Sequence, residues 1–158
     1  MSKSLKRVKA ALAAAGLEVA VIEMPGETRT AEMAAAAAGC MVDQIAKSII
    51  FQGLERGHVI LFITAGGRQV DPDLASALAG ERLGKADADL IRRETGFAIG
   101  GVAPIGHLNP VRAFFDPRLL EFDRVWAAAG TPRHIFAIAP QRLLTLSGAV
   151  CKSFTSGA

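Results

Sequence analysis

A single lysine stands in a segment that otherwise has the composition of a buried strand. The segment Gln44–Phe51 reads Gln-Ile-Ala-Lys-Ser-Ile-Ile-Phe, with Lys47 near its centre. β-Branched and aromatic residues favour strands with little solvent exposure, and an unpaired ammonium buried there would cost several kcal/mol. Two interpretations remain open. Lys47 either binds an anion in a cleft, or it extends its amine to water from the edge of the strand.

A glycine-rich segment about fifty residues later can bind a ligand through its backbone N–H groups. Residues 95–107 contain four glycines and one proline, which predicts an ordered, tightly turned loop. The backbone N–H groups of Gly100 and Gly101 can hold a carbonyl oxygen or a phosphate. Together with Lys47, they predict a site for a phosphate-bearing ligand with a polarised carbonyl. His107, which follows the loop, either shapes that pocket or faces water as a turn residue.

Two hydroxyl residues are further candidates for the same site. Thr30 either lines the site or only caps a helix, and Ser48 either lines it or is an ordinary strand hydroxyl. The motifs GxSxG, GxxxxGK[ST] and HExxH are absent from the sequence. The histidines lack the spacing of metal ligands, so we expect no metal and no cofactor, and we expect two reduced thiols. The three histidines are His58, His107 and His134, and the two cysteines are Cys40 and Cys151.

Length and composition predict one domain over residues 1–158, with a hydrophobic share of 51% and a net charge of +3. No apolar run has the roughly 18–20 residues of a membrane span, and we expect a cytoplasmic protein. The charge is uneven, because four basic residues precede the first acidic one, Glu18. This pattern suits either a phosphate backbone or a solvated helix face. The four residues are Lys3, Lys6, Arg7 and Lys9.

The elements that position these residues form an irregular series of helices and strands. The Lys47 strand and residues 58–64 are predicted to pair as a hairpin, and Thr30 is predicted to cap a helix that ends at Gly39. We expect six or seven strands and five or six helices in an α+β domain, with a mixed sheet surrounded by helices. Further strands are expected at 17–24, 111–115, 122–128 and 134–139, further helices near 4–15, 72–78, 88–94, 117–120 and 140–146, and a frayed tail at 153–158.

Three segments in this order resemble the YbaK-type family of aminoacyl-tRNA editing domains, which includes the editing insertion of bacterial prolyl-tRNA synthetase and free-standing relatives. The segments start at Thr30, Gln44 and Thr95, and the last contains a GxxxP motif at Gly100–Pro104. The similarity continues through Asp116, Ala129-Gly130 and Pro140-Gln-Arg-Leu143.

The resemblance implies a trans-acting deacylase that hydrolyses the ester of mischarged tRNA. By this analogy Lys47 contacts the phosphate near the terminal adenosine, and the N–H groups around Gly100 and Gly101 orient the aminoacyl carbonyl. Pro104 completes the loop motif. The family is thought to use water as the nucleophile, assisted by the ribose 2′-OH of the tRNA, and to select small amino acids by size.

The resemblance implies tRNA(Pro) carrying a small amino acid as the substrate. In the branch that removes cysteine, a serine precedes the Ala-Gly pair, whereas this chain has Ala128 there. Alanine and serine are therefore at least as well supported as cysteine. An alternative is a non-catalytic module that binds RNA or an aminoacyl-tRNA synthetase through its basic first helix. That module would bind RNA in a salt-dependent manner without needing Lys47.

Overall fold

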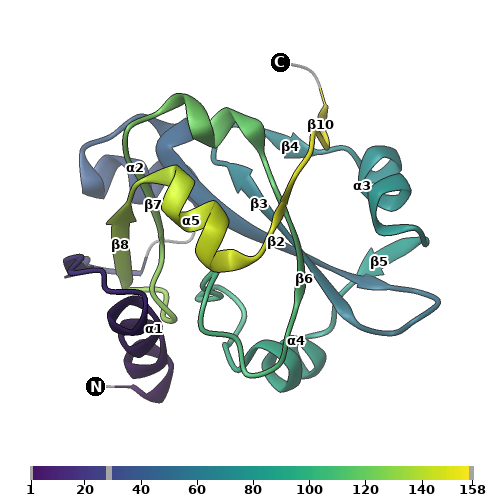
Figure 1. Cartoon of the computed structure of the whole chain (residues 1–158), viewed down its shortest axis with the longest axis horizontal. Helices are drawn as coiled ribbons and strands as arrows, with labels where there is room; N and C mark the ends of the chain where they lie inside the picture. Colours follow the sequence, from purple (N-terminus) through teal and green to yellow (C-terminus); the bar gives the residue numbers. More distant parts are fainter. Residues whose placement is uncertain (1, 28–29, 157–158) are drawn as a thin grey trace.

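The computed structural model describes residues 2–27 and 30–156. These contain five α-helices, two 3-10 helices (η) and ten strands (Figure 1). In chain order they are α1 (Lys3–Ala14), β1 (Val21–Glu23), α2 (Ala31–Ala38), η1 (Val42–Gln44), β2 (Ile45–Gly53), β3 (Val59–Ala65), β4 (Gln69–Val70), α3 (Pro72–Ala79), β5 (Leu83–Lys85), α4 (Ala88–Thr95), β6 (Arg112–Phe115), η2 (Pro117–Glu121), β7 (Val125–Ala128), β8 (His134–Ile138), α5 (Pro140–Ser147), β9 (Val150–Cys151) and β10 (Thr155–Ser156).

The main sheet has eight strands and mixes parallel with antiparallel pairs, in the order β1-β8-β7-β2-β3-β6-β9 with β5 also paired to β2. One edge of β2 pairs with β3 along most of its length. The opposite edge pairs with β7 at Ile45 and Ala46 and with β5 from Phe51 to Gly53. Between these two short pairings, the edge of β2 faces no strand of the described chain. The sheet therefore has a gap beside Lys47.

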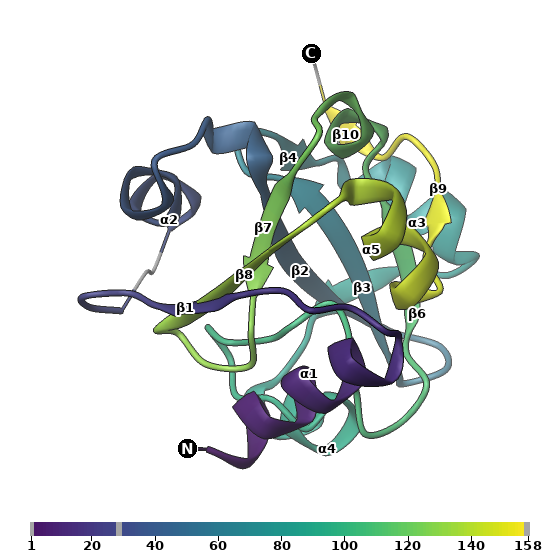
Figure 2. The ribbon, with the colours of Figure 1, turned by 60° about the vertical axis from the view of Figure 1, so that its left-hand side comes forward.

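Helices pack on the sheet and bury apolar residues in its core: α1, α4 and α5 share the largest cluster, and α2 and α3 contribute to two smaller ones. Helix α1 buries Leu5, Val8 and Leu12 in the largest apolar cluster, because these residues recur on one face of the helix. Helix α2 packs on β2 and β7 through its alanines. Figure 2 shows α1 and α4 below the strands and α2 to their left.

The expected fold class is confirmed, since the chain forms an α+β domain with a mixed sheet and helices around it. The predicted hairpin is β2–β3, and Thr30 caps α2 by accepting a hydrogen bond from the Met33 N–H at 3.1 Å. The sheet has eight strands rather than six or seven. Strands β5 and β9 have only three and two residues, too few for a periodic pattern to show.

Two expectations about chain ends and strand length were wrong. The tail is ordered as far as Ser156: the side chain of Phe154 is fully buried, and β10 pairs with β4. The apolar ring contacts of Phe154 hold this segment in the core. The strand expected over residues 17–24 is limited to Val21–Glu23, the part that pairs with β8. Within the described residues, no helix has the length and apolarity that a membrane span requires.

Candidate functional site

A cavity of about 600 Å³ occupies the gap in the sheet. Successive side chains of a strand point to opposite faces, yet Lys47 and Ser48 both line this cavity because it extends around the unpaired edge of β2. The other lining residues are Thr30, Ala31, Glu32, Ala34, Ile45, Ala46, Ile49, Ile50, Gly66, Gln69, Lys85, Ala86, Ile91, Ile99, Gly100, Val102, Trp126, Ala127, Ala128, Thr131, His134 and Ile135.

The unpaired edge also directs backbone groups toward the gap. Gly53 N–H donates to the His58 carbonyl of the β3 side, whereas Leu54 N–H donates to the Arg82 carbonyl of the β5 side. Along an antiparallel strand, the N–H and C=O groups of successive residues point alternately to one edge and to the other. The register is unbroken from Ala46 to Gln52, so the N–H and C=O groups of Ser48 face the gap.

The ammonium group of Lys47 is held in place by a backbone carbonyl. Its Nζ donates a hydrogen bond to the Gly66 carbonyl oxygen at 3.1 Å, and it forms no ion pair with any described residue. Burial lowers the pKa of Lys47, while the negative charges of Glu32, Asp43 and Asp116 act in the opposite direction. The result is a cation that lines the cavity and has no anionic partner in direct contact.

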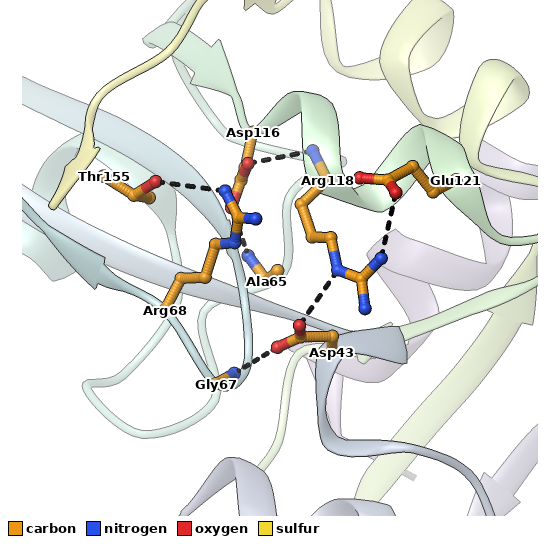
Figure 3. Close-up of polar contacts among 8 residues, drawn as sticks. All are labelled: Asp43, Ala65, Gly67, Arg68, Asp116, Arg118, Glu121 and Thr155. Atoms are coloured by element: carbon orange, nitrogen blue, oxygen red, sulfur yellow. Dashed lines mark hydrogen bonds and ion pairs between the residues drawn. The ribbon is translucent and has the colours of Figure 1, made fainter. Parts of the chain in front are cut away.

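The turn that carries Gly66 is fixed by two aspartates, drawn in Figure 3. Asp43 accepts hydrogen bonds from the Gly67 N–H at 2.8 Å and from Arg118 Nε at 3.0 Å. Burial raises the pKa of Asp43, but the Arg118 and Gly67 hydrogen bonds and the nearby arginine charges outweigh it, so this pKa is lowered. Asp43 is therefore an anionic support of the turn.

The second aspartate, Asp116, is buried beside the same turn. Its carboxylate accepts from the Ala65 N–H at 3.1 Å and from the Arg118 N–H at 3.0 Å. Because Ala65, Gly66 and Gly67 are consecutive, hydrogen bonds from both sides fix the carbonyl that holds the amine of Lys47.

The glycine-rich loop forms the opposite wall of the cavity. Gly100 is exposed and has a φ of +91°, a conformation that favours glycine. Gly101 is buried, and a Cβ there would lie 2.8 Å from the Thr131 Cα. The loop can therefore approach the β7–β8 turn only because residue 101 has no side chain.

A chain of hydrogen bonds supports this neighbouring turn. The Thr131 hydroxyl lies 2.6 Å from His134 Nδ1, and His134 Nε2 lies 3.2 Å from a carboxylate oxygen of Glu23 on β1. Thr131 also accepts a hydrogen bond from the Arg133 N–H at 3.1 Å. These contacts hold the turn against Gly101 and so support the loop, and both Thr131 and His134 also line the cavity.

Five of the predicted site residues line one cavity, namely Thr30, Lys47, Ser48, Gly100 and Ala128. Gly101 and Pro104 are buried within the loop and do not line the cavity. The Oγ of Ser48 is the one buried side-chain N or O atom without a hydrogen-bond partner in the described part of the chain.

His107 does not line this cavity. Its Nε2 lies 2.8 Å from the Ala103 carbonyl oxygen, and its ring packs edge-on against Phe97. The residue is half-buried, and its role in the site stays a prediction. Burial, chiefly, and the charge of Arg7 lower the pKa of His107, although its hydrogen bond to Ala103 acts in the opposite direction.

Several lining residues were not predicted from the sequence. Thr131 and His134 reach the cavity through the β7–β8 turn, and the Ala129-Gly130 pair was the only local signal for it. Lys85 gave no signal, because it lies on a three-residue strand. No group of three or more His, Cys, Asp or Glu side chains within residues 2–27 and 30–156 could hold a metal ion.

Comparison with known proteins places the chain in a family. The sequence profile of the aminoacyl-tRNA editing domain matches residues 25–146, more than half of the chain. The chain belongs to the aminoacyl-tRNA editing domain family. The uncharacterized Bacillus subtilis protein YwhH is 30% identical over 144 residues, which cover 91% of each chain.

Solved structures of similar sequence have the same fold as this editing domain. One is the crystal structure of a protein proposed to be a trans-editing enzyme for prolyl-tRNA synthetase. It is 44% identical, with a TM-score of 0.91 and 99% coverage of both chains. The hypothetical protein APE2540 is 26% identical, with a TM-score of 0.85 and coverage of 95% of this chain and 99% of its own.

Proposed function

We propose that this editing domain hydrolyses the ester bond of mischarged tRNA, and that the cavity beside Lys47 is its active site. The observation that carries the proposal is the ammonium of Lys47, which lines the cavity without an ion-pair partner among residues 2–27 and 30–156, while the Gly66 carbonyl fixes its position. The membership of the chain in an aminoacyl-tRNA editing family supports tRNA as the ligand.

In this proposal Lys47 binds the phosphate beside the terminal adenosine. A charged hydrogen bond in a partly buried site is stronger than one in water. The position of the amine is set before the substrate arrives, so little reorganisation accompanies binding. Lys47 therefore anchors the end of the tRNA and is not a nucleophile.

The backbone of the Gly100 loop orients the aminoacyl carbonyl at the opposite wall, and the carbonyl of Ser48 is an available acceptor for the substrate ammonium. A water molecule attacks the carbonyl carbon of the ester, and the bond to the ribose oxygen breaks. The ribose oxygen takes the proton that the water loses, and free tRNA and the amino acid leave. Positioning and charge stabilisation suffice because this ester is an activated bond.

The family resemblance, rather than the width of the cavity, is the ground for expecting a small amino acid. Alanines at 46, 86, 127 and 128 make this part of the cavity wall apolar. An apolar pocket distinguishes substrates that differ by one hydroxyl only weakly, by about 100-fold or less. We therefore expect alanyl-, seryl- and cysteinyl-tRNA(Pro) to be hydrolysed at rates within that range, and correctly charged prolyl-tRNA to be hydrolysed far more slowly.

Deacylation of these four charged tRNAs by the wild-type protein and by Lys47→Ala tests the proposal. The wild type should release alanine, serine or cysteine faster than the spontaneous rate in buffer, and Lys47→Ala should not. The proposal fails if none of the mischarged tRNAs is cleared above the spontaneous rate, or if the alanine variant is as active as the wild type.

A further inference from the structure

Helix α1 has three lysines on its outer face that no described residue neutralises. Lys3, Lys6 and Lys9 are all exposed, and none forms an ion pair with a residue of the described chain. Spaced by three residues, they extend over about 9 Å of the helix. The first acidic residue of the sequence is Glu18, beyond the end of α1. The outer face of α1 is therefore purely basic.

These charges do not stabilise the helix that carries them. The amino end of a helix has a partial positive charge, so cations near it are unfavourable by about 0.3–1 kcal/mol each. Lys3 and Lys6 lie at that end, and α1 has no acidic residue in its first turn and no basic residue in its last turn. Positive charge accumulates at one end of the helix without an internal electrostatic partner.

The same helix is fastened to both ends of the cavity loop. Arg7 donates from Nε to the Gly106 carbonyl at 3.0 Å and from Nη2 to the Gly96 carbonyl. Its guanidinium lies 4.9 Å from the centre of the Phe97 ring. The hydroxyl of Ser4 donates to Gly96 as well, at 3.5 Å. The position of α1 is thus fixed relative to the loop that lines the cavity.

The distance from α1 to the cavity is short on the scale of an RNA stem. Gly96 precedes Gly100, which lines the cavity, by four residues, so the two are at most ~14 Å apart along the chain. Figure 2 shows α1 lying beneath this part of the molecule. A ligand whose end occupies the cavity would have its next segment within reach of α1.

We propose that the outer face of α1, formed by Lys3, Lys6 and Lys9, binds the phosphate backbone of the base-paired RNA stem whose 3′ end enters the cavity. Each strand of duplex DNA carries one charge per about 3.4 Å of helix axis, and a base-paired RNA stem is similarly dense, so a 9 Å row of ammonium groups parallel to the axis spans about three phosphates. The inference rests on the proposed function, which supplies RNA as the ligand. The helix contributes affinity, whereas the cavity performs the chemistry.

The test measures binding of an uncharged hairpin RNA with a paired stem and a single-stranded 3′ tail that ends in adenosine. Fluorescence anisotropy over a series of salt concentrations compares the wild type with the variant Lys3→Gln, Lys6→Gln, Lys9→Gln. We expect binding about tenfold weaker at low salt and a logarithmic salt slope smaller by about 2–3. Glutamine forms helices about as well as lysine. The substitutions also remove the unfavourable interaction between the lysine charges and the positive end of the helix dipole, so thermal stability should not fall.

The matched control neutralises three exposed cations elsewhere, in Arg82→Gln, Arg124→Gln, Lys152→Gln. This control should bind the hairpin with the wild-type affinity and slope. Equal slopes for the wild type and the α1 variant would overturn the inference, and so would an equal loss in the control.

A second measurement separates this inference from the proposed function. The 3′ tail alone, aminoacylated and without a stem, should be hydrolysed equally fast by the wild type and the α1 variant. Absence of hydrolysis by the wild type would contradict the proposed function while the binding experiment still judges α1. A slower rate for the α1 variant on this stemless substrate would show that the lysines act in the cavity and would overturn the inference.

Discussion

Two glycine-containing segments flank the cavity, and they are built differently. The turn at Gly66 and Gly67 has no free space, because a Cβ on Gly66 would lie 2.2 Å from the Val42 carbonyl oxygen. In the loop between Gly96 and Gly106, a Cβ on Gly100 would meet nothing within 4 Å. The first segment is enclosed along its length, while the second is open at its tip.

The hydrogen bonds of the two segments differ in the same way. Asp116 and Asp43 fix the Gly66 turn on both sides, at Ala65 and at Gly67 (Figure 3). Arg7 holds the loop only at Gly96 and Gly106. In the proposed function the turn fixes the lysine for a phosphate that every tRNA has, and the loop contacts the amino acid that varies. The rigid wall therefore serves the constant part of the substrate.

Among the variants that test this difference, Gly66→Ala should lose the most unfolding free energy. The added methyl group would clash with the Val42 carbonyl and the Ala31 side chain, and overpacking against backbone costs about 3 kcal/mol or more. Urea denaturation should show this loss of unfolding free energy. A loss below about 1 kcal/mol would mean that the turn is not enclosed as described.

Removal of the guanidinium in Arg7→Met should have the next largest effect. It leaves the Gly106 carbonyl without its side-chain donor and the Gly96 carbonyl with only the Ser4 hydroxyl, which should cost about 2 kcal/mol. Amide hydrogen exchange should accelerate within residues 96–106 and stay unchanged at residues 65–67. Arg92→Met, an exposed site on α4, is the matched control. Unchanged exchange in the loop would contradict the clamping role of Arg7.

The variant Asp43→Asn should cost about 1–2 kcal/mol at neutral pH, because it weakens a charged hydrogen bond to Arg118. The pKa of Asp43 is lower in the folded protein than its ordinary value of 3.8. The charge of Asp43 therefore stabilises the fold fully above pH 3.8. This stabilisation is lost as the pH falls through the lower pKa of the folded state. Urea denaturation below pH 4 should therefore show a shrinking difference between wild type and variant. A difference independent of pH would contradict the anionic role.

The smallest expected effect is on Gly100→Ala. Space is available for the methyl group, so only the positive φ opposes the change, at about 1 kcal/mol. The matched variant Gly101→Ala should lose more unfolding free energy, because its methyl group would meet the Thr131 backbone. Equal losses at the two positions would contradict the description of an open loop tip.

Local signals in the sequence predicted the parts of the fold that depend on neighbours in the chain. Thr30, Asp71 and Asp87 cap their helices as residues of this type do. The apolar pattern around Lys47 predicted β2, and its short connection to residues 58–64 predicted the hairpin. These features are determined within a few residues of sequence.

The parts that were not predicted depend on contacts between distant segments. Strand β5 has only three residues and exists because it pairs with β2, and β10 exists because Phe154 packs in the core. The packing of His107 against Phe97 follows from the path of the whole loop. The gap in the sheet that forms the cavity is likewise a product of two non-local pairings, and no local pattern encodes it.

Two lysines that line the same cavity provide the most direct test of the central claim. Lys47 is fixed by the Gly66 carbonyl, whereas Lys85 is exposed. Single-turnover hydrolysis of alanyl-tRNA(Pro) should be about 100-fold slower in Lys47→Ala, as when a fixed charge-stabilising donor is removed, and within about threefold of wild type in Lys85→Ala. A Lys47→Ala variant as fast as the wild type, or an equal loss in Lys85→Ala, would contradict the account.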